Sequence, residues 1–340
     1  MIFKREPHPV YETIGLINFL HHREDVKETT IEALNHMGIE GRQFYETNFP
    51  LIEKLADDFA EKHVPHPDED FLFKDESLDC TFSILACLLE YPDWLRQDFS
   101  ASEEEVLHIW SQMVRDDLLT GRKAPDLSTL EGRIAFLEEQ DMTDGAKWNA
   151  MVIFNNPVRY TRALAEICRL NLPAYDYAVS RNKEEMESFI AAFCTEQIEH
   201  EPFLKALKEL NDNMTVYPSM ASPLAEWGLD SCCFYGVLVN KAFMFDGIDS
   251  EDQAILLSAL KILSDKTKFS ILTSLRKGEK YNLEIAEEAE ISTATASHHM
   301  GILLSSAFVT IEKREGKVYY AFAPEKIRQI ITLLEKSLLM

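Results

Sequence analysis

Two groups of polar side chains near the end of this 340-residue chain are spaced for hydrogen bonding and for charge pairing. The first is a run of short hydroxyls and imidazoles: Ser292, Thr293, Thr295, Ser297, His298 and His299. The second is a set of cations around a predicted tight turn: Lys313, Arg314 and Lys317. Hydroxyls and imidazoles can bond to base edges or phosphates, and cations pair with phosphates. Both groups therefore have the chemistry of a nucleic-acid contact.

A single helix would bring the first group to one surface. Ser292 is a residue type that caps helix N-termini, and three apolar residues follow it with helical spacing: Ala296, Met300 and Leu303. If these three face inward, the residues that lie outward or at the edge of helix 293–305, near its N-terminal half, are Thr293, Thr295, Ser297 and His298. A helix N-terminus also attracts phosphate, because its first backbone N–H groups lack a partner within the helix.

The elements around this helix complete a DNA-binding motif. Residues 282–289 form a predicted short helix that runs into a turn at Glu290-Ile291. After the second helix, residues 309–322 predict a β-hairpin, with the turn at Glu315-Gly316. Helix, turn, helix and hairpin in this order predict a winged helix-turn-helix, whose second helix lies in the DNA major groove.

This stretch resembles the ArsR/SmtB-type bacterial repressors over roughly the last quarter of the chain. The match is carried by a recognition helix with the pattern SxxTxSHH and by a wing that reads REGKVYY, at the right separation. Earlier matching positions are Leu263-Ser264-Asp265, Thr267, Ile271-Leu272 and Ile285-Ala286. The resemblance implies DNA contacts for Thr293, Thr295, Ser297, His298 and the wing residues.

The sequence departs from the family pattern at three places. Lys266 stands where the family usually has proline, and Gly301 replaces a lysine, which removes a phosphate contact and about 1 kcal/mol of helix propensity. The family's metal ligands are also missing, since residues 281–289 contain no cysteine and residues 324–340 contain no His, Asp or Cys. The resemblance therefore supports DNA binding but not metal sensing, and we expect no metal site and no cofactor.

The chain carries a formal net charge of −24, which by itself argues against DNA binding. From Glu251 onward, however, 12 basic residues balance 12 acidic residues, so the whole acidic excess lies before that point. An acidic body repels phosphate and weakens non-specific binding. Affinity for DNA would therefore depend on the winged helix and its geometry.

The first 210 residues read as a succession of amphipathic helices. The predicted ranges are 11–22, 24–37, 42–62, 78–90, 102–119, 127–140, 144–155, 157–170 and 183–210. Gly38 is a predicted C-cap, and Pro50 should end or kink the helix that contains it.

The residue composition changes at Met214. Two segments rich in β-branched and aromatic residues, 214–220 and 231–239, predict strands. Residues 243–252 form the predicted junction with the winged helix. The expected fold is therefore mainly α, with a large N-terminal helical domain of residues 1–248 that includes this small β element. A C-terminal winged helix-turn-helix domain, residues 249–340, follows it.

Catalytic or metal-binding candidates elsewhere are weak. His63 and His66 lie near two prolines that forbid the helix needed to align them, so an exposed loop is favoured over a metal site. The adjacent Cys232 and Cys233 point to opposite faces of a strand, which favours packed thiols over a redox pair. No nucleotide-binding, hydrolase or metalloprotease motif occurs. We therefore expect no catalytic residues and no enzymatic activity.

Apolar stripes on the first and last helices of the winged helix predict self-association. The stripes are Ile255, Leu256, Ala259 and Leu260 on the first, and Ile327, Ile330, Ile331, Leu334 and Leu338 on the last. We expect that a compact winged helix cannot cover both, so that they pair across a two-fold axis. The two recognition helices would then lie about one DNA turn, roughly 34 Å, apart. The alternative is that the acidic body covers the stripes.

These features predict a cytoplasmic DNA-binding transcriptional regulator, a homodimeric repressor of a palindromic operator, with no membrane-spanning segment. Its expected partners are double-stranded DNA, a second copy of itself, and a small-molecule effector held by the aromatic-rich N-terminal domain. Two other classes stay open, namely an interaction scaffold whose winged helix binds protein, and a helical enzyme with an autoregulatory DNA-binding tail. Salt-dependent binding to its own promoter DNA would distinguish the regulator from the scaffold, and turnover would support the enzyme.

Overall fold

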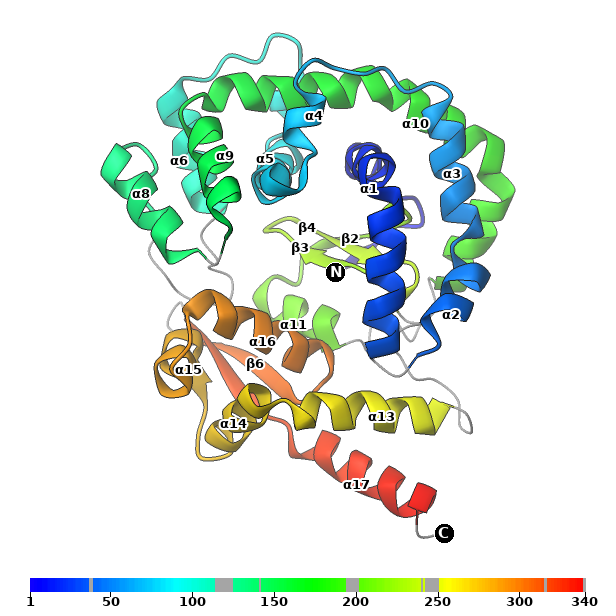
Figure 1. Cartoon of the computed structure of the whole chain (residues 1–340), viewed down its shortest axis with the longest axis vertical. Coiled ribbons are helices and arrows are strands. Elements are labelled where there is room, and N and C mark those ends of the chain that lie inside the picture. Colours follow the sequence, from blue (N-terminus) through cyan, green and yellow to red (C-terminus); the bar gives the residue numbers. More distant parts are fainter. Residues whose placement is uncertain are drawn as a thin grey trace.

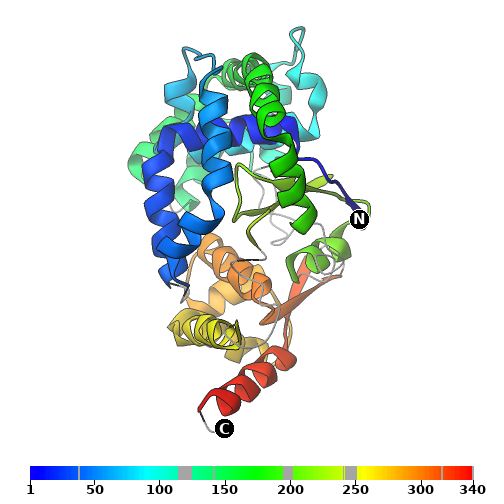
Figure 2. The ribbon, with the colours of Figure 1, turned by 90° about the vertical axis from the view of Figure 1, so that its right-hand side faces the viewer.

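The computed structural model of the chain describes residues 1–36, 39–113, 125–140, 142–193, 202–239, 241, 251–314 and 317–338. It is mainly helical with two small sheets, which confirms the predicted fold class. A helical body lies above the winged helix in Figure 1, and the same two layers are seen from the side in Figure 2. None of the helices in the described ranges is long and apolar enough to cross a membrane.

The body contains ten described helices. They are α1 (Pro9–His36), α2 (Gly41–Asn48), α3 (Pro50–Ala60), α4 (Glu69–Leu72), α5 (Leu78–Glu90), α6 (Glu103–Met113), α8 (Leu130–Glu139), α9 (Asp144–Phe154), α10 (Pro157–Phe193) and α11 (Pro202–Leu210). Short 3-10 turns occur at Asp75–Ser77 and Pro92–Leu95. α5 and α9 match their predicted ranges to within a residue. Pro50 separates α2 from α3, as predicted, and α1 has a non-helical residue at His22.

The longest helix differs from the expectation. α10 continues through Pro173, whereas the sequence predicts one helix that ends at residue 170 and another that begins at residue 183. A proline inside a helix costs about 3 kcal/mol. Ala174 and Ala178 are nevertheless buried in the core of the body, and burial of this face outweighs the local preference. The chain kinks instead at Asn182, whose side-chain amide donates a hydrogen bond to Asp58.

A four-stranded sheet lies on the concave side of these helices (Figure 1). Its strands are β1 (Ile2–Phe3), β2 (Thr215–Ser219), β3 (Glu226–Gly228) and β4 (Cys232–Gly236), in the order β1-β2-β4-β3. β2 and β4 are the two predicted strands and pair in parallel, while β1 adds to β2 in parallel and β3 pairs antiparallel with β4. β1 and β3 were not predicted, because strands of two or three residues carry no periodic signal.

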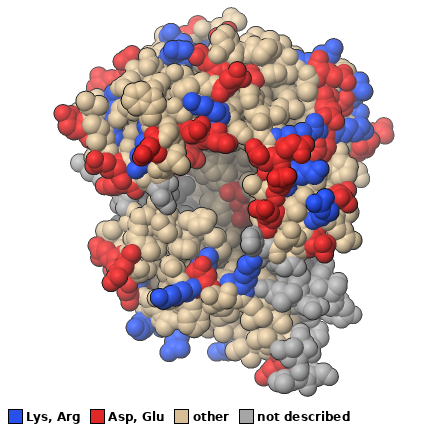
Figure 3. All heavy atoms as spheres, in the orientation of Figure 1, with Lys and Arg blue, Asp and Glu red and all other residues tan. Residues whose placement is uncertain are grey.

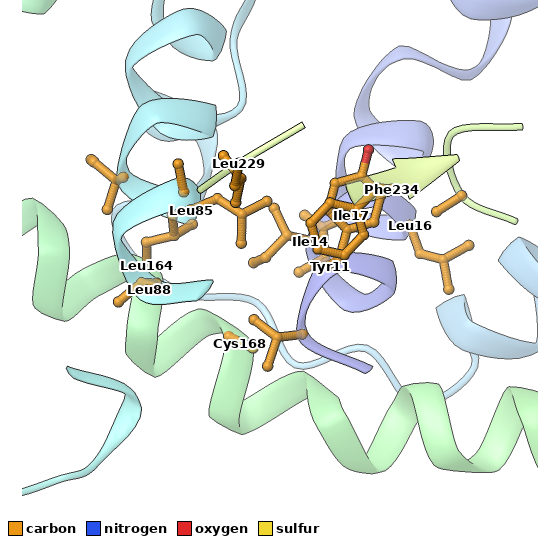
Figure 4. Packing of buried hydrophobic residues seen from close by; sticks show 14 of the residues in the cluster. Tyr11, Ile14, Leu16, Ile17, Leu85, Leu88, Leu164, Cys168, Leu229 and Phe234 are labelled. Carbon is orange, nitrogen blue, oxygen red and sulfur yellow. The ribbon is translucent and has the colours of Figure 1, made fainter. Parts of the chain in front are cut away.

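One hydrophobic core joins the helices to this sheet. Tyr11 of α1 stacks on Phe234 of β4, with ring centroids 4.0 Å apart and planes inclined by 6°. Figure 4 shows these rings beside Ile14 and Ile17 of α1, with side chains of α5 and α10 completing the packing. The first helix of the chain is thus packed against strands that follow it by about 200 residues.

A buried carboxylate makes the same long-range connection. Glu12 is 1% exposed and accepts hydrogen bonds from Ser219 Oγ at 2.8 Å and from the backbone N–H groups of Met220 and Ala221 at 3.1 and 2.9 Å. Burial raises the pKa of Glu12 to about 7, and the hydrogen bonds from Ser219 and the backbone oppose that rise. α1 therefore holds the loop that follows β2.

The winged helix contains the remaining elements. They are α13 (Glu251–Ser264), α14 (Lys266–Leu275), β5 (Lys280–Tyr281), α15 (Asn282–Ala289), α16 (Thr293–Ser305), β6 (Val309–Arg314), β7 (Lys317–Phe322) and α17 (Pro324–Leu338). The sheet has the order β5-β7-β6, and Arg314 lies opposite Lys317 in the hairpin. The predicted order of helix, turn, helix and hairpin is confirmed. Gly38, the wing turn at Glu315-Gly316 and residues 243–250 of the predicted junction lie outside the described residues.

The winged helix has its own hydrophobic cluster, separate from that of the body. In both Figure 1 and Figure 2, α16 lies between the body and α13. α11 of the body contacts both α16 and β6. The helix predicted to read DNA is therefore the helix closest to the body.

Candidate nucleic-acid interface

Local contacts position the recognition helix α16. Ser292 Oγ accepts a hydrogen bond from the backbone N–H of Thr295 at 3.0 Å, as an N-cap does. Ala296, Met300 and Leu303 are fully buried. The predicted cap and the predicted inward face are both confirmed.

Asn282, the first residue of α15, links the two helices of the motif. Its side chain is fully buried, and its amide donates to the carbonyl oxygen of Thr293 at 3.0 Å and to Ser297 Oγ at 2.9 Å. Ser297 is half-buried, and its hydroxyl keeps its hydrogen and one lone pair for another partner. The sequence analysis missed Asn282. The signal that it left unused is an amide side chain at the start of the first helix, close in sequence to the hydroxyls of the second. Ser297 thus positions α16 through Asn282.

The adjacent imidazoles of α16 have different surroundings. His298 is exposed, whereas His299 is half-buried and its Nδ1 has no hydrogen-bond partner in the described ranges. Burial lowers the pKa of His299, and Lys268 lowers it further, while Asp265 at the start of α14 acts in the opposite direction. His299 therefore packs toward α14, and its DNA contact stays a prediction.

The first turn of α16 lies against the body. Ala294 lines a cavity together with residues of α5, α6, α8 and α9, and the flanking Thr293 and Thr295 are half-buried. Figure 3 shows this side of the molecule hollowed between body and winged helix, with acidic side chains along the rim of the body. We call the packing of the body against the first turn of α16 the closed arrangement. A DNA major groove cannot take the first turn of α16 while the body occupies that side.

The wing carries three candidate phosphate contacts with unequal surroundings. Lys313 is exposed. Arg314 forms an ion pair with Glu279, which the sequence analysis did not single out. The Lys317 ammonium lies 4.2 Å from the ring centroid of Tyr281 and is exposed. Arg314 would have to exchange a carboxylate for a phosphate, so Lys313 and Lys317 are the better candidates.

The apolar stripes of the terminal helices largely cover each other. α13 packs on α17, which buries Leu256, Ala259 and Ile330, with Ile327 and Leu334 packed against the same cluster. The expectation that a compact winged helix cannot cover the stripes is therefore wrong for these residues. Leu260 and Ile331 remain 37% and 49% exposed. The side chains of Ile255 and Leu338 lie outside what the structure describes.

The histidines near α4 surround a buried carboxylate. Glu69 is 4% exposed, and its Oε1 lies 3.0 Å from His63 Nε2 and 3.2 Å from His21 Nε2. Burial acts to raise the pKa of Glu69, but hydrogen bonds from His63 and His21 lower it overall. His66 lies beside Glu166, and both loop histidines are half-buried. The loop itself is exposed at Val64, Pro65 and Pro67, as predicted. Among the described residues, no three His, Cys, Asp or Glu side chains are grouped to hold a metal ion.

The adjacent thiols of β4 are packed side chains. Cys232 and Cys233 are both buried and free. Burial raises the pKa of Cys232 to about 12, so its thiol is protonated near neutral pH. The predicted preference for packed thiols is confirmed.

The order of elements, the capped second helix and the hairpin define residues 251–338 as a winged helix-turn-helix. Residues 265–310 match the sequence model described as "Bacterial regulatory protein, arsR family". This part of the chain is therefore an ArsR-family helix-turn-helix domain, which confirms the resemblance found in the sequence.

Individual relatives match the same part of the chain. The cadmium resistance transcriptional regulatory protein CadC homolog of Staphylococcus aureus is 36% identical over 72 residues, which are 21% of this chain and 60% of that protein. The arsenical resistance operon repressors of Staphylococcus aureus and Staphylococcus xylosus are 38% and 37% identical over 65 residues, 19% of this chain and 62% of each. The chain thus spans about three fifths of the length of these relatives. No solved structure gives a significant match.

Proposed function

We propose that this chain is a DNA-binding transcriptional regulator that acts as a homodimeric repressor on a palindromic operator. The observation that carries the proposal is α16, a capped helix held in an ArsR-family winged helix-turn-helix, with exposed cations on the adjacent wing. Three relatives of this segment have names that describe transcriptional regulators or operon repressors.

The proposed contacts divide into two kinds. His298, Thr293 and Thr295 lie on or beside the N-terminal half of α16, where they would bond to base edges. Lys313 and Lys317 would pair with phosphates and hold the wing on the backbone. The winged helix offers few cations and the chain is acidic overall, so non-specific affinity should be weak, with a salt slope set by the few phosphate contacts.

Self-association would use the apolar side chains that the single chain leaves open. Leu260 of α13 and Ile331 of α17 are partly exposed on two helices that pack together. Pairing them across a two-fold axis would orient two recognition helices toward two half-sites.

We further propose that the body holds a non-metal effector. The cadmium and arsenic in the names of the relatives concern those proteins, whereas this winged helix lacks cysteine and offers only His298 and His299 as imidazoles. Thiolates or several imidazoles are needed to bind a soft or borderline ion. The body packs against the first turn of α16, so a ligand bound there has a direct route to the DNA-reading helix.

Fluorescence anisotropy with duplexes from the DNA that flanks the gene, and with scrambled duplexes, tests the proposal at several salt concentrations. His298→Ala should weaken binding to the specific duplex by about 1–3 kcal/mol, the value of a lost base contact. Lys317→Ala should weaken all duplexes alike and reduce the salt slope by about 1.

Arg328→Ala is a matched control, because it removes one exposed charge from α17, on the other side of the winged helix from α16 (Figure 1). We expect it to bind DNA as the parent does. If flanking and scrambled duplexes bind equally and His298→Ala has no effect, the assignment of α16 as the reading helix is wrong.

A further inference from the structure

A cavity lies where the body meets the recognition helix. It has a volume of about 280 Å³ and is lined by residues of α5, α6, α8 and α9 and by Ala294 of α16. This is close to the lower end of ligand pockets and roughly twice the size of an engineered cavity that binds benzene. The cavity therefore has room for a molecule of one or two rings.

Aromatic and apolar side chains form much of the lining. The ring of Phe154 lies 6.1 Å from Trp110 and 6.1 Å from Phe136, with planes inclined by 56° and 60°. Burial raises the pKa of the Cys80 thiol to about 12, so this side chain acts as a small apolar group and not as a reactive thiolate. Such a lining favours a flat, largely apolar ligand.

Trp110, which lines the cavity, carries a polar group without a partner. Its side chain is 2% exposed, and its indole Nε1 is buried with no hydrogen-bond partner in the part of the chain that the structure describes. Buried N–H groups are nearly always paired, because an unpaired one destabilises the fold. The indole N–H can only donate. The partner it lacks is therefore a hydrogen-bond acceptor.

The acidic surroundings of the cavity restrict the charge that this acceptor can carry. Asp79 of α5 also lines the cavity, and the entire acidic excess of the chain lies before Glu251. An anionic acceptor would be repelled. A neutral carbonyl, ether or ring nitrogen satisfies the indole without that repulsion.

We propose that this cavity binds a neutral molecule of one or two rings that carries a hydrogen-bond acceptor for Trp110. The effect of such a ligand on DNA binding rests on the proposed function. Because Ala294 of α16 completes the lining, a bound ligand contacts both the body and the reading helix and stabilises the closed arrangement. Since that arrangement withholds α16 from DNA, the ligand lowers DNA affinity by its preference for the closed state.

Indole N–H spectra of the full chain labelled with ¹⁵N-tryptophan test the site directly, because the chain has four tryptophans and Trp110→Phe assigns one signal. The probes are quinoline, which has a ring nitrogen acceptor, and naphthalene, which has the same shape without it. Quinoline should shift the Trp110 signal downfield with a Kd of about 10 µM to 1 mM. Naphthalene should bind about tenfold more weakly, since it leaves the N–H unpaired. Absence of any quinoline shift at Trp110 would overturn the proposal.

A matched pair of variants on α16 tests the shared lining and does not depend on the folding of Trp110→Phe. Ala294→Leu adds bulk at the cavity and should weaken quinoline binding at least fivefold. Gly301→Leu adds the same side chain two turns later, where a Cβ meets no atom within 4 Å, and should leave quinoline binding unchanged. Equal affinities for the two variants would remove α16 from the site and overturn the proposed coupling.

The DNA measurement distinguishes this inference from the proposed function. Saturating quinoline should weaken binding of the operator duplex about fivefold in the parent and not in Trp110→Phe. If the duplex binds but quinoline leaves its affinity unchanged, the coupling is wrong while the regulator proposal stands. If no duplex binds, the regulator proposal fails, and selective binding of quinoline through Trp110 still supports the cavity as a ligand site.

Discussion

The body and the winged helix are stabilised over very different separations along the chain. In the body, Glu12 bonds to a backbone N–H 208 residues away, and Asn171 bonds to Val64, 107 residues away. In the winged helix, Ser292 caps a residue three positions later, and Asn282 bonds to Ser297, 15 positions later. A contiguous segment can therefore form the DNA reader, whereas the body needs both of its ends in place. The four tryptophans all precede residue 228, so their fluorescence reports on the body alone.

Removing the carboxylate that links the ends of the body should have the largest effect on stability. Glu12→Ala leaves the buried donors of Ser219, Met220 and Ala221 without their acceptor, and we expect a loss of about 3 kcal/mol in the unfolding free energy of the body. Urea titration followed by tryptophan fluorescence measures it. Glu105→Ala, which breaks a local capping box on the surface of α6, should lower the stability by much less. Equal losses would contradict the importance of the long-range link.

The corresponding change in the winged helix is Asn282→Ala. It removes the amide that joins α15 to α16, and we expect a loss of about 2 kcal/mol in the stability of the winged helix. Far-ultraviolet circular dichroism should record the shift, while the tryptophan transition stays in place because the two clusters are separate. Ser292→Ala, which removes only the cap, should lose about 1 kcal/mol. A shift of the tryptophan transition in Asn282→Ala would show that the two parts unfold together.

Separating the two parts should change DNA binding by a smaller free energy. A fragment of residues 249–340 has neither the acidic body nor the cover over the first turn of α16. We expect it to bind the operator duplex about tenfold more tightly than the full chain, a gain of about 1.4 kcal/mol. Anisotropy at one fixed salt concentration makes the comparison. Weaker binding by the folded fragment would mean that the body assists DNA binding.

The smallest expected effect is a pH dependence confined to the body. The pKa of Glu69 is lowered in the folded chain, so its contribution to stability is present above the ordinary carboxyl range and is lost as the pH falls through that range and below. Glu69→Gln should therefore flatten the fall in tryptophan-monitored stability under acid, by less than about 1 kcal/mol. Glu103→Gln, on the exposed first turn of α6, is the control and should follow the parent. A parent-like acid profile in Glu69→Gln would remove the cluster as a source of acid sensitivity.

The same difference in contact range determines what could be predicted from sequence. The cap at Ser292, the inward face of α16 and the hairpin all follow from residues a few positions apart, and each is confirmed. The predicted helix 157–170 ends too early, because burial against distant helices carries α10 on through Pro173, whereas the predicted start at residue 183 agrees with the kink at Asn182.

The candidate site shows the same limit. The types of side chain on α16 and the wing could be predicted, but their partners could not. Asn282 donates a hydrogen bond to Ser297, Glu279 pairs with Arg314, and His299 packs toward α14. The mutual burial of α13 and α17 depends on a crossing of helices that the two apolar stripes do not reveal separately. The cavity at Ala294 draws on five helices, and no local pattern indicates such a meeting.

The pairing of β1 with β2 has a consequence for synthesis on the ribosome. Ile2 and Phe3 find their partners at Thr215 and Val216, so the first strand waits while more than 200 residues are added. At about 5–20 residues per second, that wait is roughly 10–40 s, during which α1 and its Glu12 carboxylate have no sheet to join. The winged helix is made afterwards and needs no residue of the body to form its own core. A nascent chain can therefore complete the body before the recognition helix α16 leaves the exit tunnel.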